Sequence, residues 1–106
     1  MVHLRIVVPS RQSGHALDLL QNSPSVTNLM FLERAARRPE GDVILCDVAR
    51  EDASVIVSDL RELEIDKEGS IAMEEIDSQI SEVAVEAEKA ASGLPSDAVV
   101  LSLIHI

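Results

Sequence analysis

The acidic segment from residue 64 to residue 75 has the residue types and spacing of a calcium-binding loop. Such a loop carries acidic ligands at positions 1, 3 and 5, glycine at 6, an aliphatic residue at 8 and glutamate at 12. The segment EIDKEGSIAMEE fills these places with Glu64, Asp66, Glu68, Gly69, Ile71 and Glu75. A glutamate is long for position 1, and such loops usually work in pairs whereas this chain has one. The sequence therefore favours a turn followed by an edge strand, and predicts neither a metal nor a cofactor.

The loop PSRQSGH, which follows the first apolar run, has the donors for a different ligand. Hydroxyl groups, backbone N–H groups and a guanidinium group are close together there, and these groups bind small anions. We predict a ligand site formed by Ser10, Arg11, Ser13 and Gly14. The loop lacks a phosphate-loop pattern, so a capped loop that binds nothing is the competing interpretation.

The other polar residues form no catalytic arrangement. The only basic cluster, Arg34, Arg37 and Arg38, is predicted at a solvated hairpin tip that is able to touch lipid headgroups or an acidic neighbouring domain. Asp47, in an otherwise apolar run, is predicted to cap the next helix. Cys46 is predicted to be a buried, inert thiol. The three histidines lack metal-ligand spacing, and no nucleophile and base can be paired, so an enzyme is not predicted.

Composition narrows the class of protein further. The chain has 106 residues, enough for one domain, with 9 Lys and Arg against 19 Asp and Glu, a formal net charge of -10. This charge disfavours nucleic acid and anionic membrane surfaces as partners. The single Phe, without Tyr or Trp, leaves the core to aliphatic residues. A lone cysteine suits a reducing compartment, and no stretch is long and apolar enough for a membrane helix.

Hydrophobic periodicity predicts alternating strands and helices. Residues alternate from Val2 to Val8, and an apolar stripe three to four residues apart runs from Ala53 to Leu63. Within the run 42–49, the residues after Asp42 are apolar on both faces except at Asp47, which is typical of a central strand. The predicted strands are 2–8, 26–32, 42–49 and 70–76. The predicted helices are 10–23, with Ser10 as N-cap, 50–63, and 77–93, with Asp77 or Ser78 as N-cap. The predicted connections include the segment 33–41 and the turn 66–69.

This order predicts an α+β fold of the ferredoxin-like βαββαβ type. Two split βαβ units give a four-stranded antiparallel sheet with both helices on one face, here followed by an extra C-terminal helix. We predict a ferredoxin-like, ACT-like domain over 1–76 and the additional helix over 77–93. Residues 94–100 are predicted to begin a linker.

Several segments resemble a known family. The strings HLRIVVPS, SPSVTNL, GDVILCDVAREDASVIVSDLRELEID, GSIAMEEID and PSDAVV are similar to the N-terminal region of a bacterial membrane-protein family called domain of unknown function 389, most closely to its actinobacterial members. The resemblance covers about residues 2–100. It implies a ferredoxin-like domain on the cytoplasmic face of the inner membrane, followed by a membrane domain of several helices, and it implies no reaction.

The similarity stops after Val100. The last six residues, LSLIHI, match the translation of a transposase mosaic-end adapter used in sequencing libraries, so we expect 101–106 to be non-native. The resulting prediction is a non-catalytic regulatory or interaction domain cut off before its membrane helices. Its expected partners are the membrane domain of the same protein, a second copy of the chain and a small-molecule ligand, but no nucleic acid. A free-standing soluble adaptor or ligand-binding module is the alternative.

Overall fold

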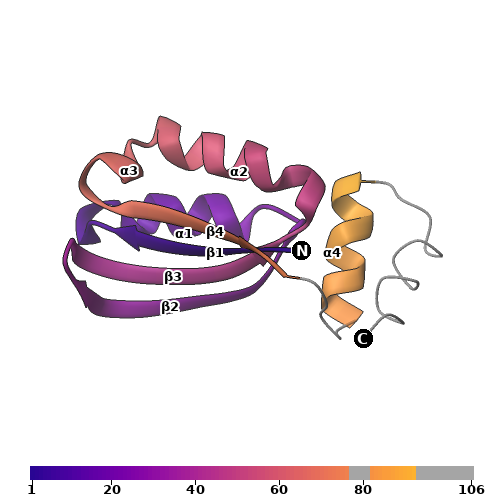
Figure 1. The fold of residues 1–106 in the computed structure, drawn as a ribbon, viewed down its shortest axis with the longest axis horizontal. Coiled ribbons are helices and arrows are strands. Elements are labelled where there is room, and N and C mark those ends of the chain that lie inside the picture. Colours follow the sequence, from indigo (N-terminus) through magenta and orange to yellow (C-terminus); the bar gives the residue numbers. More distant parts are fainter. Residues whose placement is uncertain (77–81, 93–106) are drawn as a thin grey trace.

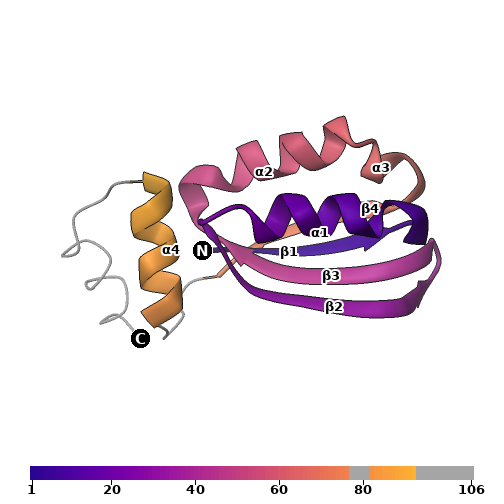
Figure 2. The same cartoon turned by 180° about the vertical axis from the view of Figure 1, so that it is seen from behind.

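The computed structural model describes residues 1–76 and 82–92. The elements in chain order are β1 (Val2–Val8), the 3-10 helix η1 (Ser10–Gln12), α1 (Ser13–Gln21), β2 (Val26–Arg37), β3 (Glu40–Val48), α2 (Arg50–Glu62), α3 (Ile65–Glu68), β4 (Ser70–Glu75) and α4 (Glu82–Ser92). The strands form one antiparallel sheet in the order β2-β3-β1-β4. Helices α1 and α2 cover one face of this sheet, and α4 stands at one end of it (Figures 1 and 2). The predicted α+β class with a four-stranded antiparallel sheet is confirmed.

The core lies between the sheet and the helices α1 and α2. Because side chains alternate along a strand, every second residue of β1 points to the helices. Leu4, Ile6 and Val8 are completely buried there, and they lie beside Ile44 and Cys46 of β3. β3 is an inner strand with buried residues on both sides, so the prediction that it is central is confirmed.

Helix α2 contributes the predicted apolar stripe to this core. Ala53, Ile56 and Leu60 are buried, and Val57 and Leu63 pack against them at the margin. Each fully buried aliphatic side chain stabilises the fold by about 1.5–3 kcal/mol relative to an exposed one. Two of the three residues in the first turn of α2 are acidic, which suits the positive end of a helix dipole.

The predicted connection 33–41 is wrong, because β2 continues through it. β2 reaches Arg37, β3 begins at Glu40, and only Arg38 and Pro39 form the turn. Two irregularities in the β2–β3 register, one between Thr27 and Met30 and one between Leu32 and Ala36, let the strand stay paired despite its charged sequence. Bulges of this kind add residues to one strand and bend it.

The predicted turn 66–69 is also replaced, since Ile65–Glu68 forms the short helix α3. Ile65 is fully buried, and this anchors the segment to the core. Gly69 follows at a place without room for a side chain, because a Cβ atom there would lie 1.9 Å from the Val7 carbonyl oxygen. The glycine thus lets the chain enter β4 next to β1.

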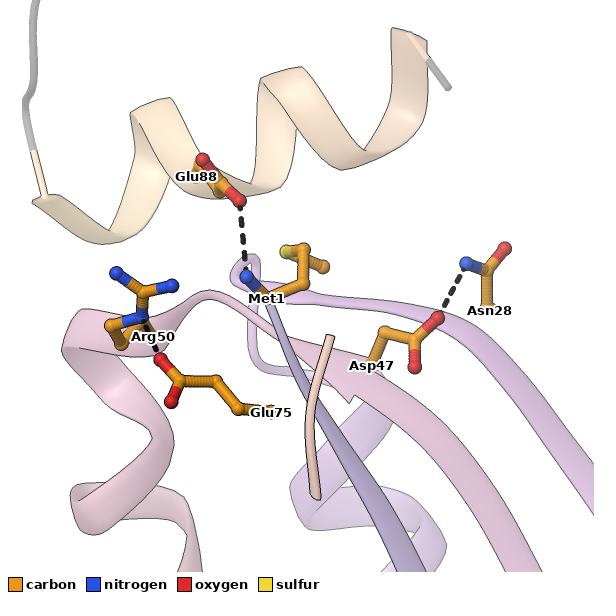
Figure 3. Close-up of polar contacts among 6 residues, drawn as sticks. All are labelled: Met1, Asn28, Asp47, Arg50, Glu75 and Glu88. Carbon is orange, nitrogen blue, oxygen red and sulfur yellow. Dashed lines mark hydrogen bonds and ion pairs between the residues drawn. The ribbon is translucent and has the colours of Figure 1, made fainter. Parts of the chain in front are cut away.

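The predicted C-terminal helix is present as α4 over 82–92. Its proposed caps Asp77 and Ser78, the linker 94–100 and the tail 101–106 lie outside the described residues. Ala84 and Ala87 are buried, and α4 contacts α2 and β2. The Met1 ammonium lies 3.5 Å from Glu88 Oε1, which ties α4 to the start of β1 (Figure 3). Within residues 1–76 and 82–92, no helix is long and apolar enough to cross a membrane.

Burial of Cys46 makes its thiol a probe of the core. The thiol is fully buried, and desolvation, followed by the nearby Asp47 carboxylate, raises its pKa to about 12. We expect no reaction with a disulfide reagent at pH 8 in the native protein and one equivalent in concentrated urea. A Ser58→Cys variant, whose new thiol lies on the exposed surface of α2, should react with one equivalent under native conditions. Rapid native labelling of Cys46 itself would contradict this packing.

Candidate functional site

Asp42, the third residue of β3, is the centre of the best-defined polar cluster. It is only 3% exposed and shares the helix-facing side of β3 with Ile44. Its carboxylate accepts hydrogen bonds from Ser13 Oγ at 2.5 Å and from Ser10 Oγ at 3.2 Å. It also accepts one from the backbone N–H of Arg34 at 2.7 Å. These bonds join η1, α1 and β2 to the start of β3, and they offset the cost of burying a charge.

The same donors keep Asp42 ionised. The Ser13 hydroxyl has the largest effect, and together with the Arg34 backbone N–H and the Ser10 hydroxyl it holds the pKa of Asp42 below the ordinary value of 3.8. Burial acts in the opposite direction, and the positive charge of Arg34 adds to the lowering. Asp42 is therefore a fixed negative charge at neutral pH.

Arg34 occupies the bulge of β2 that Asp42 anchors. Its φ of 54° lies in the left-handed region, and its N–H points to the carboxylate as a result of the bulge. Arg34 lines a pocket of about 410 Å³ together with Ser10, Ala36, Arg37, Glu40 and Gly41. We call this the hairpin pocket. Its volume is within the range of sites that hold small molecules.

The hairpin pocket brings arginine residues together in a strongly acidic protein. Arg11, Arg50, Arg61 and Lys89 each have a carboxylate partner. Arg34, Arg37 and Arg38 have no ion-pair partner within the described part of the chain, although Asp42 lies close enough to interact electrostatically with Arg34. Two of these three arginines line the pocket together with Glu40, and the Asp42 carboxylate lies behind Ser10. Guanidinium groups bind carboxylates and phosphates through paired hydrogen bonds, so the pocket is suited to a small anion.

The structure separates the four residues of the predicted loop site. Ser10 lines the hairpin pocket, and Ser13 lies behind it on Asp42. Ser10 belongs to η1 and makes no capping hydrogen bond, so its predicted role as N-cap is wrong. Arg11 points to α3 instead, with its Nη2 atom 2.6 Å from Glu68 Oε1. Gly14 lies in α1 with open space around it.

The carboxylates of the segment with calcium-loop spacing, which was predicted to be a turn and an edge strand, pair with arginine side chains. Asp66 lies 3.3 Å from Arg61 Nε, and Glu68 pairs with Arg11. Glu75 is at the far end of β4, where its Oε1 atom lies 2.7 Å from Arg50 Nε (Figure 3). Glu64 has a left-handed conformation and precedes α3, so the segment forms a helix where a calcium loop would wrap around the ion. Among residues 1–76 and 82–92, no group of three metal-ligating side chains comes together.

Asp47 anchors the other bulge of β2. Its Oδ2 atom accepts a hydrogen bond from Asn28 Nδ2 at 2.8 Å (Figure 3), and its Oδ1 atom lies 2.8 Å from His3 Nδ1. Asn28 has a φ of 53°, again in the left-handed region. The predicted capping role of Asp47 is wrong, because α2 begins after Ala49 without a side-chain cap. Asp47 instead joins β1, β2 and β3.

Sequence reasoning missed Asp42 and the pocket that it supports. The signal that was overlooked is the alternation of side chains along a strand. Asp42 is an even number of residues from Ile44, Cys46 and Val48, so it points to the same side of β3 as these buried residues. A carboxylate at such a position needs several donors, and serine hydroxyls in the preceding loop are suitable ones. The arginine cluster lies exposed at the β2–β3 hairpin, as predicted, but its contribution to a pocket was not predicted.

Comparisons with known proteins identify no relative of this chain. No protein-family model, curated protein or solved structure matches the chain. The resemblance described above therefore stays a prediction, and the function is inferred from the geometry.

Replacing Asp42 with Asn tests the cluster. An amide presents an N–H₂ group to the Ser13 hydroxyl or the Arg34 N–H, so the variant should lose about 1–3 kcal/mol of unfolding free energy at pH 7. The folded-state pKa of Asp42 is below its unfolded value, so its stabilisation exists above about pH 4 and is lost as pH falls. The gap between wild type and D42N, measured by urea denaturation, should therefore narrow toward pH 2. A gap of constant size would contradict an ionised Asp42.

Two glycines beside the cluster should respond in opposite directions to alanine. A Cβ atom on Gly41 would lie 2.3 Å from the Val8 carbonyl oxygen, so Gly41→Ala should destabilise the protein by about 1–3 kcal/mol. Gly14 meets no atom within 4 Å, and Gly14→Ala should stabilise α1 by about 0.4–1 kcal/mol. Thermal and urea unfolding measure both. Equal effects would mean that β1 and β3 do not approach closely at Gly41.

Proposed function

We propose that the chain is a non-catalytic regulatory domain that binds a small anion in the hairpin pocket. The observation that carries this proposal is the pair of arginines, Arg34 and Arg37, that line the pocket and have no ion-pair partner in the described part of the chain. Such groups attract a carboxylate or phosphate from water at low reorganisation cost, because the bulge that bears Arg34 is already fixed by Asp42.

The proposed fold is the ferredoxin-like βαββαβ sandwich. Three features support it: the order of strands and long helices along the chain, the strand order β2-β3-β1-β4, and α1 and α2 on the same face of the sheet. Small domains of this type resemble ACT-type sensor modules, which bind ligands at loops. That analogy concerns the fold alone.

We also propose that the domain belongs to a longer bacterial membrane protein and works at the cytoplasmic face of the inner membrane. The support is the sequence resemblance, which implies a membrane domain after residue 100. Reading the gene downstream of codon 100 from adapter-trimmed genomic sequence tests this proposal. A stop codon directly after LSLIHI in the genome would overturn it.

Binding of inorganic phosphate and of succinate tests the pocket. Both are small dianions near neutral pH, and at a concentration of 100 times Kd a ligand stabilises the folded state by about 2.7 kcal/mol. We expect at least one of them to raise Tm beyond the effect of sodium chloride at equal ionic strength. Titration calorimetry of the same anion then gives its Kd.

Matched variants assign the binding to the pocket. Arg34→Gln and Arg37→Gln should each weaken the binding by about tenfold, which is the effect of losing about 1.4 kcal/mol of charge-assisted hydrogen bonding. Arg38→Gln removes the same charge from the adjacent turn, outside the pocket lining, and should change Kd little. Equal losses in all three variants would indicate diffuse attraction, and absence of a Tm shift with both anions would overturn the proposal.

A further inference from the structure

The hairpin pocket contains residues of both charge signs that do not pair with each other. Arg37 and Glu40 are directly opposite in the register of β2 and β3, so their side chains leave the hairpin on the same side. Both residues line the pocket, both are exposed, and neither forms an ion pair in the part of the chain that the structure describes. The carboxylate of Asp42 lies behind Ser10. The pocket therefore offers a ligand negative charge as well as arginines.

The Ser10 hydroxyl group can only accept a hydrogen bond from a ligand. A serine has one hydroxyl proton, and an ionised carboxylate only accepts, so Ser10 donates its proton to Asp42 Oδ1, which lies 3.2 Å away. The lone pairs of the Ser10 oxygen remain, and Ser10 is exposed where it lines the pocket. An N–H group of a ligand therefore suits this position better than an anionic oxygen does.

We propose that the ligand of the hairpin pocket is a small zwitterion with one carboxylate and one ammonium group. Its carboxylate binds to Arg34 and Arg37, and its ammonium group donates hydrogen bonds to Glu40 and to the Ser10 oxygen. This inference rests on the proposed anion binding and adds a second charge to the ligand. A dianion would bring its second negative group close to Glu40, where like charges repel each other.

The register and the exposure of the pocket set the size of the ligand and the strength of its binding. Directly opposed residues of antiparallel strands have Cβ atoms about 4.5–5.5 Å apart, so a zwitterion with a short spacer can reach both Arg37 and Glu40. Water and salt weaken ion pairs at exposed positions. We therefore expect a Kd of the order of millimolar for such a small ligand.

Three ligands of similar size separate the contributions of the two charges. β-Alanine has a carboxylate and an ammonium group, succinate has two carboxylates, and butyrate has a methyl group in place of the ammonium group of β-alanine. NMR titration of the nitrogen-15-labelled chain at pH 7 and constant ionic strength measures Kd values in this range, and the amide signals of Arg34 and Gly41 locate the binding. We expect β-alanine to bind at least about threefold more tightly than butyrate.

Matched variants identify the residue that binds the ammonium group. Glu40→Gln should weaken the binding of β-alanine by about three- to tenfold and strengthen that of succinate, because a neutral amide neither attracts an ammonium group nor repels a carboxylate. Damage to the fold would weaken the binding of both ligands. Glu33→Gln removes the same charge from β2 outside the pocket lining and should change either Kd by less than about twofold. Arg37→Gln should weaken the binding of all three ligands.

Two results would overturn the zwitterion: equal affinities of the wild type for β-alanine and butyrate, or equal effects of Glu40→Gln and Glu33→Gln on the binding of β-alanine. In either case, succinate binding that Arg37→Gln weakens would leave the proposed anion binding in place. If none of the three ligands binds, and phosphate does not bind either, the proposed anion binding is overturned as well.

Discussion

The fold depends on satisfying two buried carboxylates of β3. Asp42 faces the helices and Asp47 faces the opposite side, and neither is exposed enough to be solvated by water alone. Each obtains a donor from a bulge of β2: the backbone N–H of Arg34 in one case and the side-chain amide of Asn28 in the other. A buried charge without such donors would cost several kcal/mol. The edge strand β2 is therefore irregular because the carboxylates of its neighbour β3 need these donors.

The need of Asp42 for a donor from β2 also determines where Arg34 and Arg37 lie. Beyond the second bulge the strand stays paired up to Arg37, so Arg34 and Arg37 lie beside Ser10 and near the ionised Asp42 while they remain exposed. The arginine-lined pocket and the buried Asp42 therefore have one origin. In a chain with a net charge of -10, this group of arginines is the observation on which the proposed anion binding rests.

Sequence reasoning succeeded where the signal is local. Alternation located β1 and β4, and the stripe from Ala53 to Leu63 located α2, because burial on one face leaves a regular period. It failed where a partner distant in sequence decides the outcome. The segment ERAAR has the composition of a loop, and only its pairing with Glu40 and Gly41 makes it a strand. Likewise the roles of Asp42 and Asp47 depend on donors 8 to 44 positions away. Of the predicted loop residues, Ser10 lines the hairpin pocket, whereas Arg11 pairs with Glu68 and Gly14 lies in α1.

β2 contributes two arginines to the hairpin pocket, so the shape of the pocket depends on how rigid that strand is. Arg34 and Arg37 line the pocket, and the first bulge lies nearer the start of the strand, between Thr27 and Met30. A ligand shifts the shape of a site only where an element has two arrangements that the ligand stabilises differently. Here both bulges are held by partly buried hydrogen bonds to carboxylates, and breaking either would leave a carboxylate short of a donor. A single arrangement of β2 is therefore favoured, and we expect the pocket to keep its shape when an anion binds.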